Sequence, residues 1–104
     1  MSTNDRIATL FAFYGPLLTQ RQQDMVYDHI YDDISFGEIA TNYNISRSAV
    51  YDAIKRCTQI MEDYEDKLHL VSKYNQRMAL YREIQAYNNN EINALVQALY
   101  ENEE

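Results

Sequence analysis

The sequence predicts an all-α fold from three observations. The 104 residues contain only two glycines and one proline, at Gly15, Pro16 and Gly37. Because these residues are the strongest helix breakers, the last two thirds of the chain should be almost entirely helical. No segment alternates apolar and polar residues as a half-buried strand would. Apolar residues instead recur at the three- and four-residue spacings of amphipathic helices.

The first helix is predicted from about Asp5 to Tyr14, with Thr3 or Asn4 as its N-cap, and Gly15-Pro16 ends it. Its apolar residues fall at i, i+3, i+4 and i+7, which places on one face Ile7, Leu10, Phe11 and Tyr14.

A second helix should begin at Thr19, which forms a capping box with Gln22. Val26 and Ile30 lie at inward positions along this helix. The pair Asp32-Asp33 would oppose the helix dipole at a C-terminus, so a loop is expected there.

A helix-turn-helix is predicted by the stretch SFGEIATNYNISRSAVYDAIKR, residues 35–56. Ser35 can cap its first helix, and Glu38 stands where it completes a capping box. Asn44 occupies the turn, and Asn tolerates the left-handed conformation that a tight turn requires. Ser46 can cap the second helix. The inward positions that would hold the two helices together are Ile39, Ala40, Tyr43, Ile45, Val50 and Ala53.

The outer face of the second helix is the surface that enters the major groove in DNA-binding forms of this motif. The candidate nucleic-acid-binding residues on and beside it are Ser46, Arg47, Ser48, Tyr51, Lys55 and Arg56. Asp52 shares this face and would repel phosphate, or accept a hydrogen bond from cytosine or from a protein donor. The alternative is an αα-hairpin that serves only as scaffold.

The helix that opens at Ser46 is expected to be the longest. Its apolar residues are spaced by alternating steps of four and three, the heptad pattern of a helix seam, at Val50, Ile54, Cys57, Met61, Tyr64, Leu68 and Val71. Such a seam needs the C-terminal segments, a second protomer, or both to cover it. Whether the helix stays straight past Leu68 is left open. Between the apolar positions lies a predicted solvated face, the candidate protein interface, formed by Glu62, Asp63, Glu65 and Asp66.

Further helices should follow, with an interruption at Asn88-Asn89-Asn90 that can cap the last helix. A compact apolar face is predicted there from Ile92, Leu95, Val96 and Leu99. The end, Glu101 to Glu104, is expected to fray. The chain is therefore expected to be a single helical domain, residues 1–104, with a core over 1–70 and a C-terminal helical extension over 71–104.

Composition argues against several function classes. The net charge of −7 divides into −2 over residues 1–56 and −5 over residues 57–104. Because phosphate neutralisation dominates nucleic-acid affinity, any such binding should be local and salt-sensitive. His29 and His69 are isolated, Cys57 is a small core residue, and the chain has no phosphate-binding glycine loop. We therefore expect no enzyme activity, no catalytic or metal-binding residues, and no cofactor. No apolar run is long enough for a membrane span, which favours a cytoplasmic protein without membrane contact.

The chain resembles two groups of known proteins. Residues Leu18 to Leu68 resemble the region-four helix-turn-helix of bacterial sigma factors. More of the chain resembles the YlxM family of small bacterial proteins, through LFAFYGPLLTQRQ, YDDISFGEIA, ISRSAVYDAIKR and EDYEDKLHL. This resemblance implies a sigma region-four-like helix-turn-helix bundle with a long helix and C-terminal helices. It also implies a regulator of the signal recognition particle pathway, which would bind the particle's RNA or its GTPase subunit.

Two other functions remain open. The first is a transcriptional regulator that binds DNA as a homodimer through the seam or the C-terminal helix. The second is an interaction protein that contacts no nucleic acid. These alternatives differ in whether duplex DNA is bound specifically and whether Arg47 matters for any nucleic-acid binding.

Overall fold

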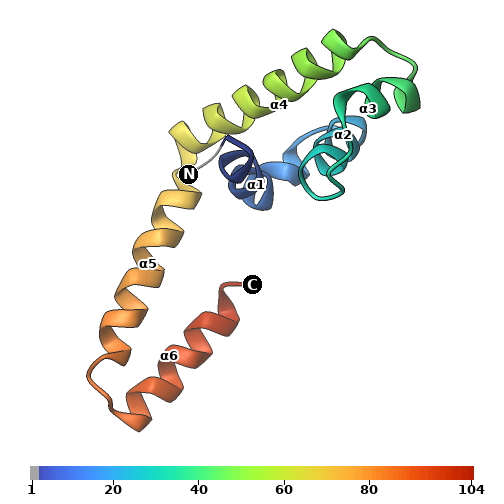
Figure 1. Cartoon of the computed structure of the whole chain (residues 1–104). Coiled ribbons are helices and arrows are strands. Elements are labelled where there is room, and N and C mark those ends of the chain that lie inside the picture. The colour runs from blue at the N-terminus through green and yellow to red at the C-terminus, as the bar shows by residue number, and fades with distance from the viewer. Residues whose placement is uncertain (1–2) are drawn as a thin grey trace. The chain divides into compact units, whose positions relative to one another are not determined.

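The computed structural model describes residues 3–104, and all regular elements in this range are helical, as the sequence predicts. The chain divides into two compact units, one ending at Val71 and one over Ser72–Glu104. The elements are α1 (Thr3–Tyr14), the 3₁₀ turn η1 (Gly15–Leu17), α2 (Gln20–Ile30), α3 (Phe36–Tyr43), α4 (Arg47–Leu68), α5 (Leu70–Gln85) and α6 (Asn90–Asn102) (Figure 1).

The first unit is built around α4, which packs against α1, α2 and α3 (Figure 1). The inward positions predicted for these helices converge on one core. Its fully buried large side chains in the first unit include Leu10, Tyr14, Val26, Ile39, Val50 and Met61. Cys57 is buried in the same core, as predicted, and carries no disulfide. This core fixes the helix-turn-helix as part of a four-helix unit.

Local capping explains where these helices begin. The Thr19 hydroxyl accepts from the backbone N–H of Gln22, and the Gln22 side chain accepts from the backbone N–H of Thr19, so the predicted capping box forms. At α3 the Ser35 hydroxyl accepts from the N–H of Glu38. Among the residues the structure describes, only this half of the capping box predicted there is formed. Helix α1 already includes Thr3 and Asn4. The prediction that one of these two residues is its N-cap is therefore wrong.

The turn between α3 and α4 has the predicted geometry. Asn44 adopts the left-handed conformation, with φ 56° and ψ 47°. The Ser46 hydroxyl then accepts from the N–H of Ala49 and starts α4. Pairing of the two helices places the outer face of α4 toward solvent.

The long seam does not continue in one helix. Helix α4 ends at Leu68 because His69 takes a left-handed conformation, with φ 57°. Two side chains then start α5: the Tyr14 hydroxyl accepts from the N–H of Leu70, and the Glu65 carboxylate accepts from the N–H of Val71. Val71 is buried, whereas Leu68 is 45% exposed. The heptad positions from Val50 to Met61 thus lie in the core on one helix. Leu68 and Val71 fall on either side of the break at His69.

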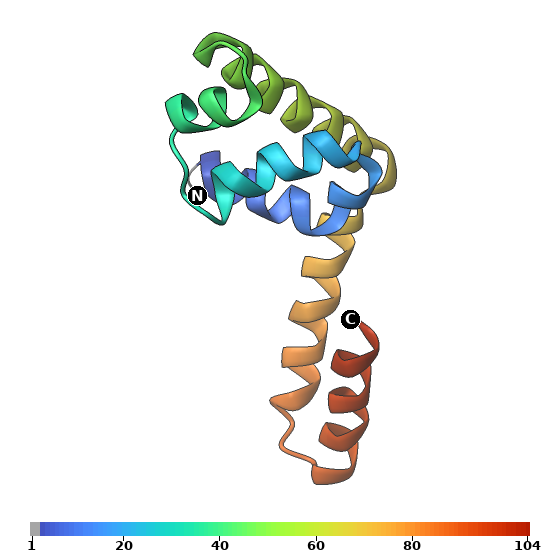
Figure 2. The ribbon, with the colours of Figure 1, turned by 90° about the vertical axis from the view of Figure 1, so that its right-hand side faces the viewer.

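The second unit is a hairpin of α5 and α6, which lie antiparallel (Figure 2). The cap predicted within Asn88-Asn89-Asn90 is Asn89, whose side chain accepts a hydrogen bond from the N–H of Ile92 at the start of α6. The predicted fraying of the C-terminus is wrong up to Glu103, because this carboxylate accepts two bonds from the Arg77 guanidinium, at 2.7 and 2.9 Å, and one from the Tyr81 hydroxyl. Within this unit only Val96 is a buried apolar residue.

Candidate nucleic-acid interface

The predicted recognition residues all lie at the surface of the first unit. Six side chains are exposed on the N-terminal half of α4 and at its cap: Ser46, Arg47, Ser48, Tyr51, Lys55 and Arg56. We call this set, together with Asp52, the α4 outer face. None of its three cations forms an ion pair with another residue in the part of the chain that the structure describes. The cations are therefore available to a ligand.

Helical geometry orders the charges on the α4 outer face. At about 100° per residue, Arg47, Tyr51 and Lys55 follow one another along one side of the helix. Asp52 lies between this line and Arg56, opposite the buried positions of α4. The face is therefore mixed in charge, with a carboxylate near its middle. Such a surface gives modest, orientation-dependent attraction to phosphate.

The aromatic ring of Tyr51 has a defined position on this face. It is 53% exposed and meets the ring of Phe36 edge-on, at 6.2 Å between centroids. Phe36 in turn packs against His29, at 4.8 Å. The three rings come from α4, α3 and α2 and form a continuous row. His29 therefore packs within this row of rings.

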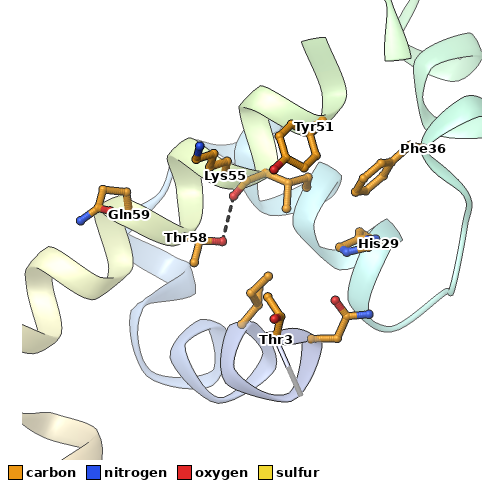
Figure 3. Close-up of a pocket in the computed structure, with 10 residues that line it drawn as sticks. Thr3, His29, Phe36, Tyr51, Lys55, Thr58 and Gln59 are labelled. Atoms are coloured by element: carbon orange, nitrogen blue, oxygen red, sulfur yellow. Dashed lines mark hydrogen bonds between the residues drawn. The ribbon is translucent and has the colours of Figure 1, made fainter. Parts of the chain in front are cut away.

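A cavity of about 380 Å³ lies beside this row, in the first unit (Figure 3). Figure 3 shows the rings of Tyr51, Phe36 and His29 along one side, and Lys55, Thr58 and Gln59 along α4. The remaining lining residues are Thr3, Asn4, Ile7 and Ile54. Sequence reasoning selected Tyr51 and Lys55 for binding but missed the other lining residues. Those of α1, α2 and α3 are distant from α4 in sequence, and no local pattern brings them together.

The four acids predicted to form one exposed protein interface do not do so. Glu65 is only 8% exposed, and its carboxylate accepts hydrogen bonds from Tyr14 and from the N–H of Val71. The prediction that it lies on a solvated face is therefore wrong, because those donors and the neighbouring core hold it inside. Glu62 pairs with Arg6 of α1 at 2.6 Å. Asp63 and Asp66 remain exposed.

Burial shifts the pKa values of side chains in the first unit, among them Cys57 and His29. Burial raises the pKa of the Cys57 thiol, which keeps it protonated and unreactive at neutral pH. Burial lowers the pKa of His29, so its imidazole is neutral at pH 7. Over residues 3–104, no cluster of three or more acidic, histidine or cysteine side chains could hold a metal ion. In the same range, no helix is both long and apolar enough to cross a membrane.

Comparisons with known proteins identify the family. The model of the family UPF0122, described as "Putative helix-turn-helix protein, YlxM / p13 like", matches residues 1–100. A UPF0122 protein of Limosilactobacillus fermentum is 52% identical over 77 residues, which cover 74% of this chain and 68% of the relative. One of Latilactobacillus sakei is 42% identical over 104 residues, covering 100% of this chain and 85% of the relative. The resemblance to YlxM proteins is thus confirmed, and the chain belongs to the UPF0122 family of YlxM/p13-like helix-turn-helix proteins.

Proposed function

We propose that this chain is a regulatory protein that binds nucleic acid through the α4 outer face. The observation that carries the proposal is the exposure of every predicted recognition side chain on α4 or at its cap, within a well-packed helix-turn-helix. Phosphate contacts come from Arg47, Lys55 and Arg56, and Ser46, Ser48 and Tyr51 contact bases or the backbone. From the family resemblance, the pathway is that of the signal recognition particle, and the target is the particle's RNA or its GTPase subunit.

The charge of the chain limits this binding. The net charge is −7, and Asp52 stands among the three cations of the face. Affinity should therefore be modest and fall steeply with salt, because few phosphates are neutralised. Selectivity must come from the shape and hydrogen bonding of the target.

The exposed acids of α4 suit a protein partner with a basic surface. Asp63 and Asp66 are exposed and Glu62 is half-buried, and these acids would contact the GTPase subunit. Glu65 is not part of this surface. We expect no catalysis, no cofactor and a cytoplasmic location.

The test is a titration of the full chain against signal recognition particle RNA, the GTPase subunit and random duplex DNA at two salt concentrations. Arg47→Ala should weaken nucleic-acid binding and reduce the salt slope by about 1, whereas Asp52→Asn should strengthen binding because it removes a repulsive charge. Asp63→Asn with Asp66→Asn should weaken only binding to the GTPase subunit. If Arg47→Ala and Asp52→Asn leave nucleic-acid affinity unchanged, the α4 outer face is not the interface.

A dimeric DNA-binding regulator is the second candidate, and one observation favours it. The second unit leaves large apolar side chains exposed, including Leu80 at 56%, Tyr87 at 82% and Leu95 at 69%. A second copy could cover them and present two α4 outer faces to a palindromic site. Specific binding to a palindrome in the presence of excess bulk DNA would favour this candidate over binding to the signal recognition particle's RNA.

A further inference from the structure

The cavity beside the α4 outer face has walls suited to a flat, unsaturated group. The rings of His29, Phe36 and Tyr51 form a row along one side of it, and the aliphatic side chains of Ile7 and Ile54 also line it (Figure 3). Its volume of about 380 Å³ falls within the roughly 300–1,000 Å³ typical of small-molecule sites. The cavity thus has space for one ring system rather than for an extended peptide.

The charge of the lining points to an occupant joined to an anion. Lys55 is the only charged side chain among the described residues that line the cavity, and no carboxylate lines it. This is unusual for a chain with 16 acidic and nine basic residues. Lys55 also belongs to the α4 outer face, so a group in the cavity can be continuous with a phosphate bound on that face.

The polar lining supplies hydrogen-bonding groups of the kind that read the edge of a base. Asn4 carries an amide, which offers both donors and an acceptor. The neutral imidazole of His29 offers one donor and one acceptor nitrogen. Thr58 donates its hydroxyl proton to the carbonyl of Ile54, at 2.9 Å, which leaves the hydroxyl oxygen as an acceptor.

We propose that this cavity binds one unpaired nucleobase of a nucleic-acid strand whose phosphates lie on the α4 outer face. The rings provide stacking, Lys55 contacts an adjoining phosphate, and the polar lining contacts the base edge. The proposal rests on the nucleic-acid binding proposed above and narrows its target to a strand with an unpaired base. A fully paired duplex cannot fill the cavity, because its bases remain stacked inside the helix.

The test uses three fluorescently labelled probes and the full chain: an RNA stem-loop with unpaired adenosines, a DNA stem-loop of the same sequence, and an RNA duplex with the same stem. The wild type should bind the stem-loops about tenfold more tightly than the duplex, the scale of one stacked base. Equal affinity for the RNA and DNA stem-loops means that only the base is recognised. A higher affinity for the RNA stem-loop means that the protein also contacts the ribose. Both results support the proposal.

Thr58→Phe should fill the cavity and abolish the preference for the loop, with duplex affinity unchanged. Thr9→Phe is the matched control, since Thr9 is also a half-buried helical threonine bonded to the carbonyl four residues earlier but does not line the cavity. Tyr51→Leu should also reduce loop binding, and its control is the similarly exposed Tyr27→Leu. Circular dichroism checks that each variant is folded.

Two results would overturn the proposal: equal wild-type affinity for loop and duplex, or loop binding that survives Thr58→Phe in a folded protein. Either result leaves the proposed function standing if Arg47→Ala still weakens binding to all three probes. In another outcome, adenosine monophosphate binds to the wild type and not to Thr58→Phe. If the wild type then shows no preference for the loop, the cavity is a nucleotide site and the strand proposal fails.

Discussion

At the scale of single residues, one buried carboxylate organises the end of the first unit. Glu65 accepts hydrogen bonds from the Tyr14 hydroxyl of α1 and from the N–H of Val71 in α5. The ring of Tyr14 is fully buried and stacks on Tyr64, at 6.0 Å between centroids. In sequence, Glu65 belongs to an acidic run and looks like a surface residue. Its role depends on contacts with a helix more than 50 residues away.

Glu65→Ala should lower the free energy of unfolding by about 1–3 kcal/mol, because it leaves buried donors without their acceptor. Asp66→Ala is the control, since this neighbouring acid is exposed, and its effect should stay within about 0.5 kcal/mol. Urea unfolding followed by circular dichroism measures both. Equal stability of the two variants would contradict a structural role for the Glu65 carboxylate.

Glu103 gives a prediction about pH. Hydrogen bonds from Arg77, and then from Tyr81, lower the pKa of the Glu103 carboxyl below its ordinary value. A carboxyl whose pKa is lower in the folded state stabilises that state above the unfolded pKa and loses this contribution as pH falls through the folded pKa. Acid should therefore detach the end of α6 from α5.

The carboxyl chemical shift of Glu103, followed by NMR during an acid titration, measures this pKa. In Arg77→Met it should return toward the ordinary value for glutamate. An unchanged Glu103 midpoint in that variant would show that the ion pair does not form in solution.

At the scale of elements, side-chain caps and one left-handed residue set the helix-turn-helix. The sequence predicts caps at Thr19, at Ser46 and within Asn88-Asn89-Asn90, and the hydrogen bonds form at Thr19, Ser46 and Asn89. These bonds are local, within three residues, so the sequence contains all the information they need. The break at His69 has no such local signal, because the side chains that start α5 beyond it are Tyr14 of α1 and the buried Glu65.

Asn44→Ala should destabilise the chain by about 1 kcal/mol relative to Asn44→Gly, because alanine pays the steric cost of the left-handed conformation and glycine does not. Thermal unfolding of the two variants and the wild type measures the difference. Thr41→Ala, at an exposed position in the preceding helix, controls for the loss of a polar side chain. If alanine and glycine are equivalent at position 44, the turn does not hold the observed conformation.

At the scale of the whole molecule, the two units differ in how much apolar surface they bury. The first unit contains nearly all of the buried core, whereas Val96 is the buried apolar residue of the second. A two-helix hairpin of this size buries too little apolar surface to be stable by that alone. The ion pair of Arg77 with Glu103 and the edge-on contact of Tyr81 with Tyr100 supplement it.

Self-association through the second unit is therefore the expected outcome at high concentration. Leu95→Glu should shift the chain toward the monomer, because it places a charge where an apolar contact would form. Gln97→Glu adds the same charge at another exposed position of α6 and should leave the oligomeric state unchanged. Sedimentation velocity over a range of concentrations distinguishes them. A wild type that remains monomeric throughout would argue against the dimeric regulator.

The sequence by itself determined the helical fold class, most helix boundaries, the turn at Asn44 and the residues exposed on the N-terminal half of α4. Periodicity, capping and glycine and proline placement act over a few residues, and they can be read directly. Only the tertiary structure decided that Glu65 is buried, that the seam breaks at His69, and that α1 and α2 close a cavity beside Tyr51 and Lys55. The physical reason is that these features depend on contacts between residues distant in sequence, whose energies no local pattern encodes.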